Sequence, residues 1–180
     1  MNYTLRTAQE EDISVLKKII SESTRELSKL HYSEEQIELA LESALGVDTQ
    51  LIKDKTYFCI EDQGEIVACG GWSYRTTLFG SDNERARNNT LLEPGSQAAK
   101  VRAFFVRSYY ARQGLGSMLM KKCESEAIAM GYSKLELMAT LPGVKLYERH
   151  GFIQQASIEY QLNDETTITF VSMSKQIELV

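Results

Sequence analysis

Residues 101–124, VRAFFVRSYYARQGLGSMLMKKCE, predict the central elements of the fold. The first six residues are mostly apolar and predict a buried strand, and after a short connection a helix is predicted from about Gly114 to Met130. Gly114 and Gly116 leave the backbone bare where this helix begins. The unpaired amides and the helix dipole at such a helix start favour an anion. The stretch therefore predicts a strand, a phosphate-binding turn and a helix.

The distribution of charge supports an anion site in the same region. The chain of 180 residues has a formal net charge of -5. Residues 100–150 hold nine Lys and Arg against four Glu, a local charge of +5, so the remaining residues carry -10. The acidic total disfavours nucleic acid and anionic membranes as partners. A basic segment in an acidic protein suggests a local anion site, and basic residues scattered over solvated faces are the alternative interpretation.

Length and composition predict a single domain over residues 1–180, with 43% hydrophobic residues to form its core. No apolar run approaches the roughly 18 residues of a membrane span, and the first residues do not form a signal peptide, so we expect a cytoplasmic protein. The odd number of cysteines (Cys59, Cys69 and Cys123) argues against a disulfide framework. Two histidines far apart, without ligand-spaced carboxylates, predict no metal site.

Two other phosphate-binding motifs fit the helix start poorly. A P-loop requires Gly-Lys-Ser or Gly-Lys-Thr, whereas this chain has Leu115-Gly116-Ser117. A dinucleotide-binding motif requires a third glycine where Leu119 stands, although Glu136 lies twenty residues after Gly116, as its acidic ribose ligand would. The motif also lies past the midpoint of the chain, which leaves too few residues for a doubly wound sheet.

Patterns along the rest of the chain predict a mixture of strands and helices. Gly70-Gly71, inside the second strand of a predicted hairpin, suggests a bulge or a close backbone approach. The predicted elements are a strand over residues 3–6, a helix from Ile13, a helix from Ser33 with Gln36 completing its N-terminal cap, a hairpin of residues 56–61 and 65–74, a long surface loop over 76–98, a strand over 134–139, a short helix over 141–149 and a closing hairpin of 156–162 and 166–173.

Two segments resemble motifs of the GCN5-related N-acetyltransferase (GNAT) superfamily. Residues 111–116, Ala-Arg-Gln-Gly-Leu-Gly, resemble its coenzyme A signature R/Q-x-x-G-x-G/A, with Ala111 at the first position and Arg112 placed to supply the cationic contact one residue later. Residues 140–152, TLPGVKLYERHGF, resemble its N-x-x-A-x-x-L-Y-E-x-x-G-F segment, with Thr140 in place of Asn and Gly143 in place of Ala. The order of the predicted elements also matches, so the resemblance covers nearly the full chain.

The resemblance implies both a fold and an activity. The fold would be α/β, with a mixed, mainly antiparallel sheet of six to seven strands that is flanked by helices and splayed at the cofactor site. The activity would be transfer of acetyl from acetyl-CoA to a primary amine by direct attack in a ternary complex, with a small-molecule amine favoured as acceptor. A protein or peptide amino group as acceptor, and a non-catalytic acyl-CoA-binding sensor, are the alternatives. A homodimer is compatible with the sequence.

The resemblance also implies roles for individual residues. The N–H of Val106 would polarise the thioester carbonyl and stabilise the oxyanion. Tyr147 would be the general acid that protonates the departing thiolate, and packing of its ring in the core is the alternative. The residues implied in binding acetyl-CoA are Phe104, Phe105, Val106, Ala111, Arg112, Gln113, Gly114, Leu115, Gly116, Ser117, Thr140 and Tyr147.

The acceptor ammonium must lose a proton before it attacks, so a base is needed. The family often places a carboxylate on the strand before the cofactor motif, but here that strand carries Lys100 and Arg102 and no acid. The candidates are Glu136, His31 or an ordered water chain. The resemblance further implies an acceptor pocket lined by His31, Tyr32 and Trp72, and a place in the core is the alternative for Trp72.

Overall fold

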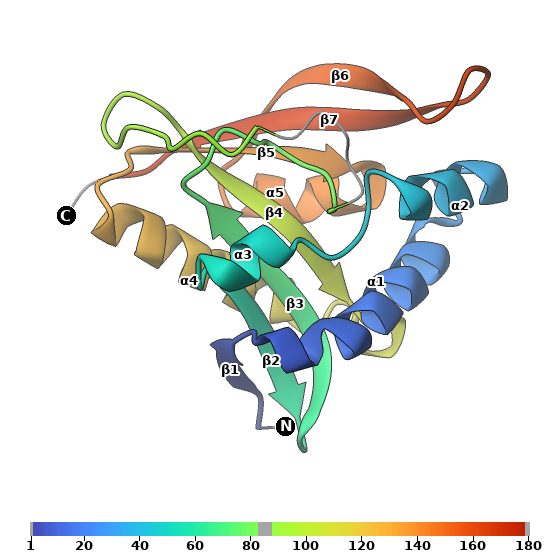
Figure 1. The fold of residues 1–180 in the computed structure, drawn as a ribbon, viewed down its shortest axis with the longest axis horizontal. Helices are drawn as coiled ribbons and strands as arrows, with labels where there is room; N and C mark the ends of the chain where they lie inside the picture. Colours follow the sequence, from blue (N-terminus) through green and yellow to red (C-terminus); the bar gives the residue numbers. More distant parts are fainter. Residues whose placement is uncertain (1, 83–87, 179–180) are drawn as a thin grey trace.

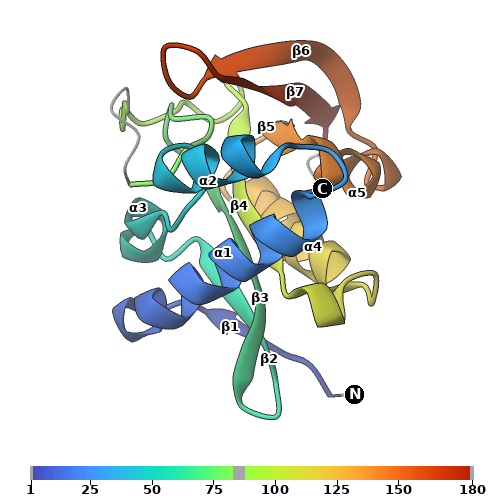
Figure 2. The same cartoon turned by 90° about the vertical axis from the view of Figure 1, so that its right-hand side faces the viewer.

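The computed structural model describes residues 2–82 and 88–178 and contains one seven-stranded sheet with helices on both faces (Figures 1 and 2). The strands are β1 (Thr4–Thr7), β2 (Tyr57–Asp62), β3 (Glu65–Ser73), β4 (Ala99–Val106), β5 (Lys134–Thr140), β6 (Ile153–Gln161) and β7 (Thr167–Gln176). The helices are α1 (Ile13–Ser28), α2 (Glu34–Glu42), α3 (Thr49–Lys53), α4 (Leu115–Ala129) and α5 (Val144–Arg149), with short 3-10 helices η1 (Glu10–Asp12), η2 (Ser108–Tyr110) and η3 (Leu141–Gly143). The predicted fold class is confirmed.

The order of the strands across the sheet is β1-β2-β3-β4-β5-β7-β6. All neighbours are antiparallel except β4 and β5, which run parallel and are joined by the crossover helix α4. This is the predicted strand, helix and strand unit. Figure 1 shows the β6–β7 hairpin at one end of the sheet and β1 at the other.

The sheet separates two apolar layers, because successive side chains of a strand point to opposite faces. Phe58 and Ile60 of β2 pack in the core that contains the buried side of α4. Tyr57 and Cys59 alternate with them and pack with α1 on the other face. Figure 2 shows α1 in front of β2–β4 and α4 behind them.

The predicted helix termini are present in the structure. The Ser33 hydroxyl accepts the N–H of Gln36 at 3.1 Å, and the Gln36 side chain accepts the N–H of Ser33 at 2.9 Å, so α2 begins with a full capping box. Helix α4 begins after Gly114, whose φ is 88°. It is followed by Gly131, with φ 87°, which is the left-handed conformation that glycine adopts most readily.

Other boundaries differ from the predictions. The structure adds the short helix α3, and β6 begins at Ile153, three residues before the predicted strand. The predicted 76–98 loop folds back on itself, because Thr76 N–H donates to Thr90 O at 2.9 Å and Leu92 N–H to Tyr74 O at 2.8 Å. Residues 83–87 of that loop lie outside the described residues.

The three cysteine thiols are free and buried. Within residues 2–82 and 88–178, the helices are too short or too polar to cross a membrane.

Candidate active site

The centre of the molecule opens where β4 and β5 separate. Only Ala99 and Lys100 of β4 pair with β5, opposite Leu135 and Glu136. Beyond Lys100, β4 continues to Val106 and pairs only with β3, while β5 continues to Thr140. The space between the diverging strands belongs to a cavity of about 520 Å³, which α1, α4 and α5 also line. The predicted splay of the sheet is therefore present.

A bulge in β4 decides which face of the sheet each of its two phenylalanines occupies. The register between β3 and β4 shifts between Cys69 and Gly71, and Ala103 has a φ of 56°, which is rare outside glycine. Phe104 turns toward α5, and Phe105 packs with the layer that contains α1. A Cβ on Gly70 would lie 2.4 Å from the Phe104 ring, so the glycine makes room for that ring.

The backbone of Val106 presents its N–H to the cavity. The N–H of the next residue, Arg107, donates to the Val67 carbonyl of β3 at 2.9 Å. Successive residues of a strand direct their N–H groups to opposite sides, so the Val106 N–H points away from β3. That side of β4 has no strand partner beyond Lys100. The Val106 amide is therefore placed to bind a group inside the opening.

The first turn of α4 forms one end of the cavity. Gly114, Leu115, Gly116 and Ser117 all line it, and a Cβ on Gly114 would meet no atom within 4 Å. The amides of this turn have no partner within the helix, which is the arrangement that binds phosphate oxygens.

Three of the nine cations in residues 100–150 line the cavity, namely Arg102, Arg112 and Arg149. Arg112 and Arg149 are exposed at the end formed by α4 and α5. Others pair with acids elsewhere, such as Lys100 with Glu136 and Lys122 with Glu126. The cationic part of the site is therefore smaller than the local charge of +5 suggests.

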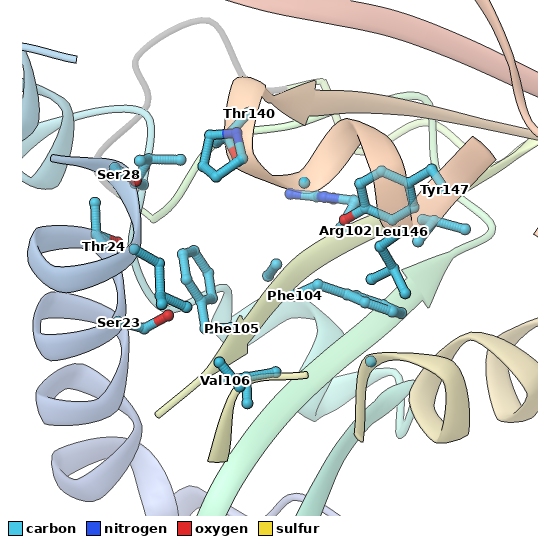
Figure 3. A pocket seen from close by; sticks show the side chains of 18 of the residues that line it. Ser23, Thr24, Ser28, Arg102, Phe104, Phe105, Val106, Thr140, Leu146 and Tyr147 are labelled. Atoms are coloured by element: carbon cyan, nitrogen blue, oxygen red, sulfur yellow. The ribbon is translucent and has the colours of Figure 1, made fainter. Parts of the chain in front are cut away.

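Tyr147 of α5 extends into the cavity opposite α1 (Figure 3). Its ring lies 6.1 Å from the ring of Phe104 and 5.9 Å from that of Phe152, measured between centroids. Burial raises the pKa of Tyr147 above its ordinary value of about 10, with a smaller contribution from Cys123. The phenol therefore stays protonated at neutral pH and can donate a proton.

The other end of the cavity is lined by α1, by the α2–α3 connection and by aromatic rings. Figure 3 shows Ser23, Thr24 and Ser28 of α1 on the side opposite Tyr147. All three are buried, at 4% exposure each, and among the described residues the Thr24 hydroxyl has no hydrogen-bond partner. Phe79 and Phe170, whose centroids lie 5.6 Å apart, complete this wall.

A buried ion pair supports the floor of the cavity. The guanidinium of Arg102 contacts the carboxylate of Asp48, and it also donates to the Gly80 carbonyl at 3.4 Å. Arg102 is 4% exposed and Asp48 is fully buried. The pair thus ties β4 to the residue that precedes α3, next to the opening.

The sequence of the chain matches the model of the Acetyltransferase (GNAT) family over residues 16–152. The chain belongs to the GNAT acetyltransferase family. Among curated protein sequences, none matches the chain.

Solved GNAT structures share the fold at low sequence identity. A GCN5-related N-acetyltransferase from Rhodopseudomonas palustris is 18% identical, with a TM-score of 0.71 over 98% of this chain and 97% of its own. The PaiA N-acetyltransferase from Thermoplasma acidophilum, in complex with coenzyme A, is 15% identical, with a TM-score of 0.65 over 98% and 99%. YncA from Salmonella typhimurium, a protein described as an acetyltransferase and solved with acetyl-CoA, is 13% identical, with a TM-score of 0.62 over 98% and 94%.

The GNAT motifs converge on the cavity. All residues that the sequence implies in cofactor binding line it except Gln113. The Gln113 side chain instead accepts a hydrogen bond from the Tyr3 hydroxyl at 2.6 Å and donates to the Tyr109 carbonyl at 3.1 Å.

The residues expected to recognise the acceptor lie outside the cavity lining. His31 is exposed after the end of α1. The Tyr32 hydroxyl, which is part-buried, donates to Thr169 O at 2.7 Å and accepts from Leu141 N–H at 2.8 Å, and burial raises the pKa of Tyr32 to about 12. Trp72 is 1% exposed in the core against α4, and its indole N–H donates to Glu126 at 3.1 Å.

Glu136, a candidate base, is held by two lysines outside the cavity. Its carboxylate lies 2.7 Å from Lys100 Nζ and 3.1 Å from Lys134 Nζ. Burial raises the pKa of Glu136, but the hydrogen bonds from the two lysines outweigh that effect and hold the pKa below its ordinary value. A carboxylate of this kind accepts a proton poorly.

Among the site features that the sequence did not indicate are the hydroxyls of Ser23, Thr24 and Ser28. Their spacing along α1 is helical, but nothing in a single amphipathic helix says what its hydroxyl-bearing side will face. Tertiary packing of α1 over β4 decides it.

Proposed function

We propose that this GNAT protein transfers an acetyl group from acetyl-CoA to a primary amine, by direct attack of the amine on the thioester while both substrates are bound. The separation of β4 from β5 at the start of α4 carries the proposal. It places an unpaired strand backbone, a helix N-terminus and Tyr147 around one cavity. The family and the relatives solved with coenzyme A or acetyl-CoA support the choice of donor.

Groups around the cavity suit the phosphates, the pantetheine arm and the thioester of the donor. The first-turn amides of α4, with Arg112 and Arg149 nearby, suit the phosphates. The open side of β4 suits the amide groups of the pantetheine arm, because its own N–H and C=O groups have no strand partner there. The Val106 N–H would then polarise the thioester carbonyl, and Tyr147 would protonate the thiolate as it leaves.

A small-molecule acceptor fits the opposite end of the cavity best. The wall there consists of buried hydroxyls from α1 and the rings of Phe79 and Phe170, with Arg102 beneath them. Hydroxyls in an apolar wall orient a compact ligand through a few hydrogen bonds.

The proposal is tested by thiol release from acetyl-CoA with a panel of amines, with binding of acetyl-CoA measured in parallel by calorimetry. We expect binding, thiol release with at least one small amine, and a product that carries the acetyl group on nitrogen. Binding without release on any small amine or peptide would contradict the enzyme and favour an acyl-CoA sensor.

We predict that Val106→Pro lowers kcat by about a hundredfold, the cost of losing one donor to an oxyanion. Proline removes the N–H that points into the cavity, while the hydrogen bond from Arg107 to Val67 stays. Steady-state thiol release measures the effect. Val106→Ala keeps the N–H and should lose much less. Equal losses in the two variants would mean that the side chain, and not the amide, matters.

We predict that kcat/KM rises with pH up to the pKa of the acceptor amine itself and then becomes constant. Glu136 and His31 lie outside the cavity, so the amine would lose its proton to water and react as the neutral species. Glu136→Gln should change kcat/KM by less than about threefold at every pH. The measurement is a pH profile with two amines of different pKa. If kcat/KM instead stops rising at the same pH for both amines, and this pH dependence disappears in Glu136→Gln, Glu136 is the base.

A further inference from the structure

A histidine lies behind the phosphate-binding turn and contacts it through a serine. His150 follows the last residue of α5, and its Nε2 lies 2.9 Å from the Ser117 hydroxyl. Ser117 belongs to the first turn of α4 and lines the cavity, whereas His150 does not. The pair thus joins the cavity to a half-buried imidazole outside it.

Charged groups from two elements face this imidazole. They are Lys121 and Glu124 of α4 and Lys175 of β7, and Glu124 and Lys175 are ion-paired at 2.7 Å. Burial lowers the pKa of His150, the two lysines lower it further, and Glu124 opposes them. His150 is therefore mostly neutral at pH 7 while the cavity is empty.

The hydroxyl of Ser117 has one proton to donate. If His150 Nε2 accepts that proton, Ser117 has none to offer to a ligand in the cavity. If Nε2 carries its own hydrogen and donates to Ser117, the serine proton is released for an oxygen in the cavity. An anionic oxygen at the α4 terminus favours the second arrangement and a positive charge on the ring behind it.

We propose that His150 is a positioning residue for the donor: when the diphosphate of acetyl-CoA binds, His150 takes up a proton and donates from Nε2 to Ser117, which donates to a diphosphate oxygen. The inference rests on the proposed function, because it assigns the diphosphate to the first turn of α4. No covalent bond changes. One proton moves from solvent to the imidazole.

The coupling gives binding a defined pH dependence. The pKa of His150 would be low in the free protein and raised in the complex. The donor therefore binds most tightly below the free pKa, and its affinity falls as the pH rises through the pKa of the complex. If the pKa of His150 rises by one unit on binding, the affinity well below the free pKa is tenfold higher than the affinity well above the pKa of the complex.

The test is an NMR pH titration of the imidazole signals in the full chain, with and without saturating dephospho-CoA. This probe keeps the diphosphate and lacks the 3′-phosphate, which would titrate in the same range. The chain has two histidines, and His31, exposed and outside the cavity, is the internal reference. We expect the pKa of His150 to rise by about one unit on binding, whereas the probe should leave the His31 signals unchanged.

Two variants distinguish the hydrogen-bonded path from His150 through Ser117, here called the relay, from a direct electrostatic effect of the bound diphosphate on His150. Ser117→Ala should abolish at least half of the rise at His150, because the hydrogen-bonded connection is gone. His150→Gln should make the affinity for dephospho-CoA independent of pH over the range in which the wild-type affinity falls by about tenfold. Circular dichroism confirms that both variants are folded.

The outcomes distinguish the inference from the function on which it rests. A bound probe with an unchanged pKa at His150, or the full rise in Ser117→Ala, would overturn the relay and leave the acetyltransferase proposal standing. If the wild type binds neither dephospho-CoA nor acetyl-CoA at any pH, both proposals fail.

Discussion

Tyr147→Phe is expected to lower kcat by on the order of a thousandfold, which lies within the range for loss of a general acid. The substitution removes one oxygen and keeps the ring that packs against Phe104 and Phe152. The departing thiolate would then have no phenol to protonate it. Steady-state thiol release measures kcat, and calorimetry should show acetyl-CoA bound nearly as tightly as before.

The matched control is Tyr109→Phe, because Tyr109 is 88% exposed and lies outside the cavity lining. Its kcat should equal that of the wild type. The raised pKa of Tyr147 adds a pH prediction: the phenol keeps its proton up to and above its ordinary value of about 10, so no loss of rate between neutral pH and that value should arise from Tyr147. Full activity in Tyr147→Phe would remove the residue from the mechanism.

Asp48→Ala is expected to lower the free energy of unfolding by about 3–5 kcal/mol, as loss of one member of a buried ion pair does. Arg102 is 4% exposed, and its guanidinium would keep its charge without the Asp48 carboxylate. Chemical denaturation monitored by circular dichroism measures the loss. Glu38→Ala is the control, because Glu38 pairs with Arg25 where both side chains are about half exposed, and it should change little.

A double replacement tests the cause. Asp48→Leu together with Arg102→Met removes both charges and fills the space with apolar atoms, so it should be more stable than Asp48→Ala. If the double variant were as unstable as the single one, packing around α3 and not the uncompensated charge would explain the loss.

The cofactor half of the site could be predicted because its signals are local. Gly114 and Gly116 sit at a helix start, and the Leu-Tyr-Glu segment around Tyr147 follows a strand directly. Each of these motifs depends on the backbone conformation of only a few neighbouring residues, so the sequence is enough to predict it. The structure then needed only to bring α4, α5 and β4 together, which the order of strand, helix and strand requires.

The acceptor half could not be predicted because it is built from distant segments. Trp72 lies four residues after Ala68 on β3, so both side chains point to the same face of the sheet. That face packs against α4, and the indole is therefore in the core. The sequence alone does not say which of the two sets of alternating side chains on a strand faces α4 and which faces α1. Tyr32 has a polar end that suits a ligand equally well, but its hydroxyl instead joins β7 to the start of η3.

Acetyl-CoA should lie in the opening between β4 and β5 with its phosphates at α4. Amide hydrogen exchange with and without saturating acetyl-CoA measures this placement, because the Val106 amide and the first-turn amides of α4 would gain hydrogen-bond partners. We predict slower exchange in peptides that cover residues 104–106 and 113–117, and unchanged exchange in β6. Unchanged exchange at both of the first two segments, with acetyl-CoA shown to be bound, would contradict this binding position.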